Sequence, residues 1–271
     1  MHRVGTMRTF AAALASLGLA ALAGSAAAQT GTERTFSAEY AVIARGVNAG
    51  EFNFEFTQTG ASYTAGAERR MTGLARVALG NSQDYNYSVT GAVAEDGALR
   101  PRNYQHQGGR RRDDRPNGRL VRATFSANDV VTESVPAGMG MGDPPATAAQ
   151  RRGVIDQITA IAAMVTATGD PCDRTLRVYM DGRSRFDFVL SPNGRVNVRS
   201  PAYEGSAIRC RVQFRPIAGF GDPQEPGVLT FLFAETASGM YAPIRIEMPS
   251  DDVGVVRLDA RRLTVNGTRL R

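Results

Sequence analysis

The stretch of sequence that decides the fold runs Glu51-Phe52-Asn53-Phe54-Glu55-Phe56-Thr57. Apolar and polar side chains alternate along it, so all three phenylalanines point to one face of an extended chain. A strand of an antiparallel sheet with one buried face has this pattern, whereas a strand of a parallel sheet would be apolar throughout. These residues therefore predict an antiparallel sheet that covers a hydrophobic core with one face.

Similar alternation recurs through the rest of the chain. Apolar side chains take alternate positions in four further stretches, at residues 85–89, 178–180, 186–190 and 244–246. The chain also contains Asp181-Gly182, Asn193-Gly194 and Asn266-Gly267, which favour tight hairpins because both residues of each pair can adopt a positive φ. We therefore predict a mainly β fold, an antiparallel sheet curled into an open barrel or spiral.

One segment follows a different period. From about residue 146 to residue 168, apolar side chains recur at helical spacing, at Val154, Ile155, Ile158, Ile161, Ala162 and Val165. Pro144-Pro145 precedes this segment and Gly169-Asp170-Pro171 ends it. The spacing predicts one amphipathic helix of roughly four turns, packed on the concave face of the sheet. A helix on a membrane surface is the alternative, but basic residues gather only at Arg151-Arg152.

The first 28 residues have the pattern of a secretory signal peptide. Arg3 and Arg8 give a positive start, an apolar run extends from residue 10 to residue 23, and Ala26-Ala27-Ala28 has the small side chains that signal peptidase requires. An anchored transmembrane helix is the alternative, but the run is shorter than the ~20 apolar residues that a span needs. We expect cleavage after Ala28 and a periplasmic mature chain, a single domain over residues 29–271 without a transmembrane span.

Composition restricts the chemistry open to the mature chain. All 32 residues counted as Lys+Arg are arginine, which excludes a Schiff-base lysine and a Walker-type phosphate loop. The predicted cleavage removes two arginines, one histidine and no acidic residue, so the formal net charge falls from +6 to +4 and His106 is the only histidine left. So small an excess does not indicate nucleic-acid binding, and two cysteines with so few histidines cannot form the usual structural zinc site. We expect no metal, no cofactor, no nucleic-acid partner, and a structural or solvated His106.

The two cysteines, Cys172 and Cys210, are predicted to form a disulfide. An exported protein matures in an oxidising compartment, where two cysteines in one chain pair by default. A redox-active or nucleophilic thiol is the alternative. The chain has no Cys-x-x-Cys motif and no second histidine in its mature part that would activate a thiol.

Two groups of residues are candidate binding surfaces. The first is the aromatic part of the apolar sheet face, which is either packed core or the lining of a cavity for an apolar ligand. Its members are Phe52, Phe54, Phe56, Tyr85, Tyr87, Phe186 and Phe188. The second is a cluster that binds an anion or a partner protein, or is the solvated tip of a hairpin. Its members are Arg110, Arg111, Arg112 and Arg115.

The order of short motifs along the chain resembles one protein family. The motifs are Tyr40-Ala41-Val42, Val47-Asn48-Ala49-Gly50-Glu51, Thr72-Gly73-Leu74-Ala75, Leu99-Arg100-Pro101-Arg102-Asn103-Tyr104, Asp156-Gln157-Ile158, Asp181-Gly182-Arg183-Ser184-Arg185-Phe186-Asp187, Cys210-Arg211-Val212 and Pro216-Ile217-Ala218-Gly219-Phe220. Together they resemble an exported bacterial family described only as a domain of unknown function, family thirty-one-oh-eight, over essentially the whole mature chain. The resemblance implies an exported all-β protein of open-barrel or spiral type, similar in outline to periplasmic lipoprotein carriers, without an established catalytic residue.

This chain departs from the family pattern in two places. Family members often have Asp-Pro where this chain has Asp156-Gln157, which affects only the local turn. The arginine cluster looks like a local elaboration, so the resemblance assigns it no role.

These observations predict a non-catalytic periplasmic protein of the cell envelope that binds a lipid, a lipoprotein or another apolar ligand in its curved sheet. The alternative is an envelope scaffold with a filled core, which binds other proteins through edge strands or through the arginine-rich hairpin. A third alternative is a carboxylate-dependent hydrolase acting on wall polysaccharide. The acidic residues are scattered, however, and no pair has the spacing that glycoside hydrolysis suggests.

Overall fold

A computed structural model describes residues 33–73, 84–108, 119–135, 137, 143–220, 225–250 and 254–271. The predicted signal peptide and its cleavage site lie outside these residues. Within them, no helix is long and apolar enough to cross a membrane.

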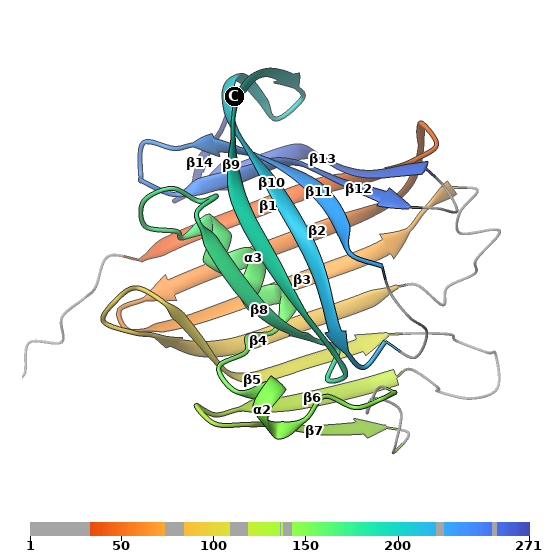
Figure 1. Cartoon of the computed structure of the whole chain (residues 1–271). Helices are drawn as coiled ribbons and strands as arrows, with labels where there is room; N and C mark the ends of the chain where they lie inside the picture. Colours follow the sequence, from red (N-terminus) through yellow and green to blue (C-terminus); the bar gives the residue numbers. More distant parts are fainter. Residues whose placement is uncertain are drawn as a thin grey trace, which may run out of the picture.

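One antiparallel sheet of 14 strands makes up most of the described chain (Figure 1). The strands are β1 (Arg34–Ala44), β2 (Val47–Thr59), β3 (Ser62–Met71), β4 (Tyr85–Val93), β5 (Leu99–Gly108), β6 (Arg119–Phe125), β7 (Val130–Val135), β8 (Arg174–Met180), β9 (Ser184–Ser200), β10 (Tyr203–Ala218), β11 (Gly227–Glu235), β12 (Tyr241–Ser250), β13 (Gly254–Val265) and β14 (Thr268–Arg269). Their order across the sheet is β7-β6-β5-β4-β3-β2-β1-β13-β12-β11-β10-β9-β8, with β14 beside β13. The sheet is therefore an open meander in which pairing of β1 with β13 joins the two halves of the chain, and the predicted fold class is confirmed.

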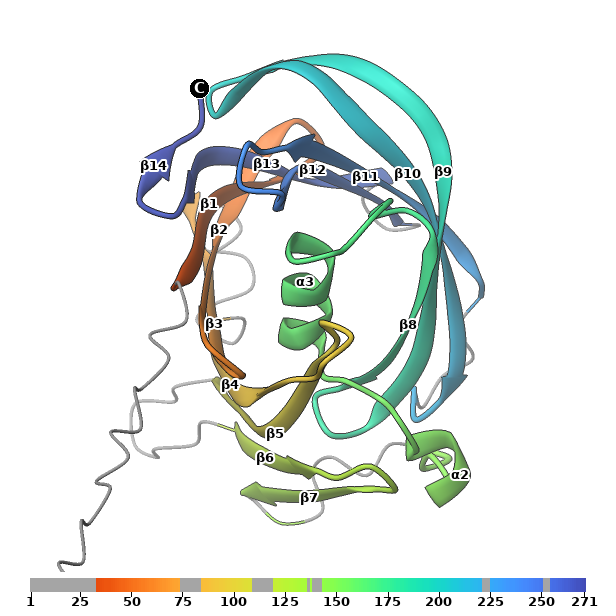
Figure 2. The ribbon, with the colours of Figure 1, turned by 90° about the vertical axis from the view of Figure 1, so that its left-hand side faces the viewer.

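The sheet curls around a helix. Figure 2 shows α3 (Gln157–Val165) enclosed by the curved strands, with β8 on one side and β1 to β5 on the other. Ile158, Ala162 and Val165 belong to a larger cluster formed mainly with β1–β6 and β11–β13, whereas Ala160 and Met164 belong to a smaller cluster formed with β8–β11. A helix with two covered sides needs apolar residues around most of its circumference, and the composition of α3 meets that need.

The single helix predicted over residues 146–168 is wrong in its extent, because two helices, α2 (Ala148–Arg151) and α3, occupy this segment. Gly153 adopts a positive φ of 61° between them. Ile155 is extended and forms a β-bridge with Val178 of β8. The Ile155 N–H donates to the Arg177 carbonyl, and the Tyr179 N–H donates to the Ile155 carbonyl, each over 2.9 Å. The apolar side chains at 154 and 155 thus belong to a bridge that covers the free edge of β8.

Two of the three predicted hairpin turns are confirmed. Asp181-Gly182 joins β8 to β9, and Asn266-Gly267 joins β13 to β14. Asn193-Gly194, in contrast, lies inside β9, where the register shifts between Ile208 and Cys210 of β10. Since Gly194 has a φ of 77°, the pair forms a β-bulge within a long strand and not a turn between two strands.

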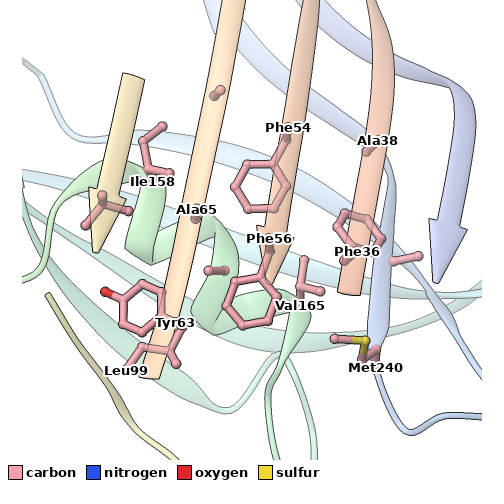
Figure 3. Close-up of a cluster of buried hydrophobic side chains, with 14 of the residues drawn as sticks. Phe36, Ala38, Phe54, Phe56, Tyr63, Ala65, Leu99, Ile158, Val165 and Met240 are labelled. Atoms are coloured by element: carbon pink, nitrogen blue, oxygen red, sulfur yellow. The ribbon is translucent and has the colours of Figure 1, made fainter. Parts of the chain in front are cut away.

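The core has two parts, one on each side of α3. The larger part includes Phe54 and Phe56 of β2 and Tyr63 of β3, which lie beside Ile158 and Val165 of the helix (Figure 3). The smaller part lies between α3 and β8–β11 and contains Cys172 and Cys210. These two cysteines form the predicted disulfide, with their Cα atoms 5.2 Å apart, which joins the connection before β8 to β10.

Candidate functional site

The aromatic residues proposed as a ligand-binding face are divided between the two parts of the core. Phe54 and Phe56 are fully buried in the larger part, where Phe52 and Tyr87 pack beside them. The remaining members lie elsewhere: Phe186 and Phe188 are in the smaller part of the core, and Tyr85 is half-buried beside Tyr87. The seven residues therefore do not form one continuous surface, because α3 stands between the two groups. The four arginines of the predicted anion patch lie outside the described residues.

The edge strand β8 and its turn meet the opposite wall along a line that we call the seam. Gly182 in the β8–β9 turn packs so closely on Val121 of β6 and Thr132 of β7 that an added Cβ would lie 2.9 Å and 2.5 Å from their methyl groups. Asp181 of the same turn accepts a hydrogen bond of 3.1 Å from the Tyr104 hydroxyl of β5. The barrel is thus closed here by side-chain contacts, although its edge strands do not pair.

A partly buried polar cluster occupies one end of the seam. The Asp181 carboxylate also accepts a hydrogen bond of 2.6 Å from the Gln157 side chain of α3, and it lies 3.2 Å from Nδ1 of His106. His106 is 1% exposed and packs against the rings of Tyr85, Tyr87 and Tyr104. Burial raises the pKa of Tyr104, so its hydroxyl stays protonated and donates to the carboxylate.

The cluster connects three elements that are far apart in the sequence. His106 is buried and not solvated, and its partners Gln157 and Asp181 come from the start of α3 and from the β8–β9 turn. Asp181 holds a left-handed φ of 52°, which is uncommon for a residue other than glycine. Sequence reasoning missed this cluster, because nothing in the spacing of residues 106, 157 and 181 indicates contact.

A cleft of about 310 Å³ opens at the other end of the seam. It lies between the β4–β5 turn, the C-terminal half of α3 and β8; Gly97 in that turn comes close to Thr168 just after the helix. Figure 2 shows the β4–β5 turn approaching α3 from the opposite wall. Apolar side chains form much of the lining, namely Ala98, Leu99, Ile155, Ala163, Ala167 and Leu176.

Arginines supply most of the charge of the cleft. Arg100, Arg174 and Arg177 line it, against a single acidic residue, Asp96. Arg174 donates hydrogen bonds to the carbonyls of Ala163, Thr168 and Asp170, at 3.3, 3.4 and 3.1 Å, and so compensates the negative C-terminal end of α3. Burial lowers the pKa of Arg174, but an arginine remains charged at any physiological pH.

The described residues contain no group of three or more His, Cys, Asp or Glu side chains placed to hold a metal ion. The residues that line the cleft present apolar side chains, guanidinium groups and threonine hydroxyls. Side chains of these kinds are able to hold a small ligand.

Comparison with known families gives a match that covers most of the chain. The profile of a family described as "Protein of unknown function (DUF3108)" matches residues 35–261. The chain belongs to this family. The DUF3108 match extends from β1 into β13 and so includes α3, both cysteines, the seam and the cleft, which confirms the resemblance found in the sequence. No curated protein and no solved structure matches the chain.

Proposed function

We propose that this protein is a non-catalytic, exported component of the cell envelope that binds an apolar ligand in the cleft beside the seam. The observation that carries the proposal is the apolar lining of a cleft of about 310 Å³ next to a packed core. This volume lies at the lower end of the roughly 300–1,000 Å³ typical of small-molecule sites. The signal-peptide pattern of residues 1–28 supports export to the periplasm.

The proposal places the ligand at the seam and not between the sheet and α3. Phe54, Phe56, Ile158 and Val165 pack together on the inner face of the sheet, so the helix occupies the space that a lipid would take in an empty barrel. The cleft, in contrast, is open to solvent beside Leu99 and Leu176.

A pair of matched variants tests the proposal. Ala98→Trp places a large side chain at the cleft, whereas Ala61→Trp places the same side chain in the exposed β2–β3 turn, away from it. We expect the neutral fluorescent probe phenylnaphthylamine to bind the wild type, and Ala98→Trp to weaken that binding at least about tenfold, or ~1.4 kcal/mol. Ala61→Trp should bind like the wild type, and thermal unfolding should show that both variants are folded.

Equal probe binding by both variants would place the ligand elsewhere, and absence of probe binding to the wild type would refute the proposal. Native mass spectrometry of protein purified from the periplasm supplies a second readout. We expect it to show a co-purifying adduct of lipid mass.

A second candidate function is an envelope scaffold, which the filled interior favours. The edge strand β7 presents Val131 and Val135, with exposed fractions of 63% and 57%. An exposed edge strand can pair with a strand of another protein. If the wild type does not bind the probe but captures a partner from envelope extract, and Val131→Lys abolishes that capture, the scaffold function is supported over ligand binding.

A further inference from the structure

The arginines at the cleft differ in how their charges are compensated. Arg100 of β5 and Arg177 of β8 are exposed, and neither forms an ion pair or a side-chain hydrogen bond with any residue that the structure describes. The cross-strand neighbour of Arg177 is Asp187, but the carboxylate of Asp187 lies 2.7 Å from Nη1 of Arg185. Two guanidinium groups on opposite sides of the cleft are thus available to a ligand.

The third arginine, Arg174, adds positive charge to the same cleft, but its guanidinium nitrogens are not open to a ligand. The two Nη atoms of Arg174 are engaged by carbonyls at the end of α3, whereas its buried Nε has no acceptor within the described part of the chain. Guanidinium groups match the geometry of carboxylate and phosphate oxygens. With Arg100 and Arg177, the polar side of the cleft therefore has the donors that an anionic group requires.

The apolar side of the cleft determines what the rest of a ligand with an anionic group must be. Leu99, Ala167 and Leu176 are almost fully buried beneath the cleft, so the part of a ligand that contacts them must be apolar. A cleft of about 310 Å³ has room for one short acyl chain, because this volume is at the lower limit for drug-sized ligands. A lipid with two long chains is too large.

We infer that the cleft binds a single-chain amphiphile with an anionic head group, either a carboxylate or a phosphate, held between Arg100 and Arg177. This inference rests on the proposed ligand-binding function and specifies its chemical class. The acyl chain lies on the leucines and alanines, and the head group remains at the solvent-exposed mouth near the two arginines.

Three ligands with the same tail test the role of the head group. Dodecanoate, dodecyl phosphate and dodecanol, each below its micellar concentration, are titrated against the full-length protein loaded with phenylnaphthylamine. We expect at least one of the two anions to displace the probe about tenfold more tightly than dodecanol does, the size of one charge-assisted hydrogen bond. The anion that binds more tightly identifies the head group.

Two double variants assign the selectivity to the cleft. Arg100→Gln/Arg177→Gln should abolish the preference for the anion while leaving dodecanol binding unchanged. Arg102→Gln/Arg211→Gln removes the same charge from exposed positions outside the cleft and should retain the preference.

The possible results separate the two proposals. If dodecanol displaces the probe as well as the anions do, or if the preference survives in Arg100→Gln/Arg177→Gln, the anionic head group is refuted while ligand binding stands. If neither the probe nor any amphiphile binds the wild type, the proposed function itself fails. Tighter binding of a two-chain phosphatidic acid than of dodecyl phosphate would refute the single chain.

Discussion

Gly182 is the residue on which closure of the barrel depends most directly. Its carbonyl accepts a hydrogen bond of 2.8 Å from the Tyr179 hydroxyl, and its φ of 69° belongs to the left-handed region. Any side chain here would meet the methyl groups of Val121 and Thr132 on the opposite wall. Two separate requirements, backbone conformation and close approach, therefore select glycine at this position.

A comparison of two glycines separates these requirements. Gly194 has a φ of 77°, but an added Cβ would have no heavy atom within 4 Å. Both Gly182→Ala and Gly194→Ala place an alanine at a positive φ, which is unfavourable for any residue with a Cβ, but only Gly182→Ala also overpacks the seam. Because overpacking typically costs about 1–3 kcal/mol, we expect Gly182→Ala to lower the free energy of unfolding by that much more than Gly194→Ala does. Urea denaturation measures both values, and equal losses would show that the seam does not resist a methyl group.

At the scale of the element, α3 depends on the carboxylate that begins it. The Asp156 side chain accepts hydrogen bonds of 2.9 Å from the backbone N–H groups of Ile158 and Thr159, and one of 2.6 Å from the Thr159 hydroxyl. That hydroxyl lies 2.7 Å from the Tyr63 hydroxyl of β3. Asp156 thus caps the N-terminus of α3 and, through Thr159 and Tyr63, also connects the helix to the sheet.

Burial raises the pKa of Asp156 above its ordinary value of 3.8, because desolvation outweighs the hydrogen bonds that favour the carboxylate. The folded state therefore binds this proton more tightly than the unfolded state does. The contribution of Asp156 to stability is greatest below the unfolded pKa and declines as the pH rises through the folded pKa.

Asp156→Asn should remove this pH dependence. The asparagine Oδ1 can still accept both backbone hydrogen bonds, while its amide donates to the Thr159 hydroxyl. We expect the free energy of unfolding of the wild type, relative to Asp156→Asn, to fall as the pH is raised from about 4, the ordinary carboxyl pKa, towards neutrality. Urea denaturation across this range measures the difference, and a constant difference would contradict the shifted pKa.

At the scale of the whole molecule, the disulfide cross-links two segments that are not adjacent in the sheet. Cys172 precedes the edge strand β8, and Cys210 lies two strands away in β10. Both are fully buried between α3 and the sheet. The bond therefore holds the outermost strand, and with it one wall of the cleft, to the centre of the C-terminal half.

Breaking the bond should lower global stability. The cysteines are 38 positions apart, and closure of a loop of this length stabilises a fold by about 4 kcal/mol on the chain-entropy model. We expect a reductant to shift the urea midpoint of the wild type downward by a corresponding amount, and to leave that of Cys172→Ala/Cys210→Ala unchanged. A wild-type midpoint that does not respond to full reduction, verified by thiol titration, would exclude this role.

Local patterns were sufficient to predict the sheet. The alternation in residues 51–57 depends only on which face of a strand each side chain occupies, and Phe54 and Phe56 are indeed buried while Glu55 between them is exposed. The cysteine pair was equally predictable, because the choice of partner was unique. The extent of the helix was not, because helical spacing at Val154 and Ile155 cannot be distinguished from the bridge that Ile155 forms with β8.

The amino-acid sequence by itself determined the antiparallel strands, the disulfide partners and the presence of a helix, since each of these follows from neighbouring residues or from simple counting. Only the tertiary structure decided where ligands can bind. The curl of the sheet brings residues 96–100 to residues 163–177, and it places Asp181 against Tyr104 and His106. These contacts depend on the twist and register accumulated over many strands, which no local sequence pattern predicts.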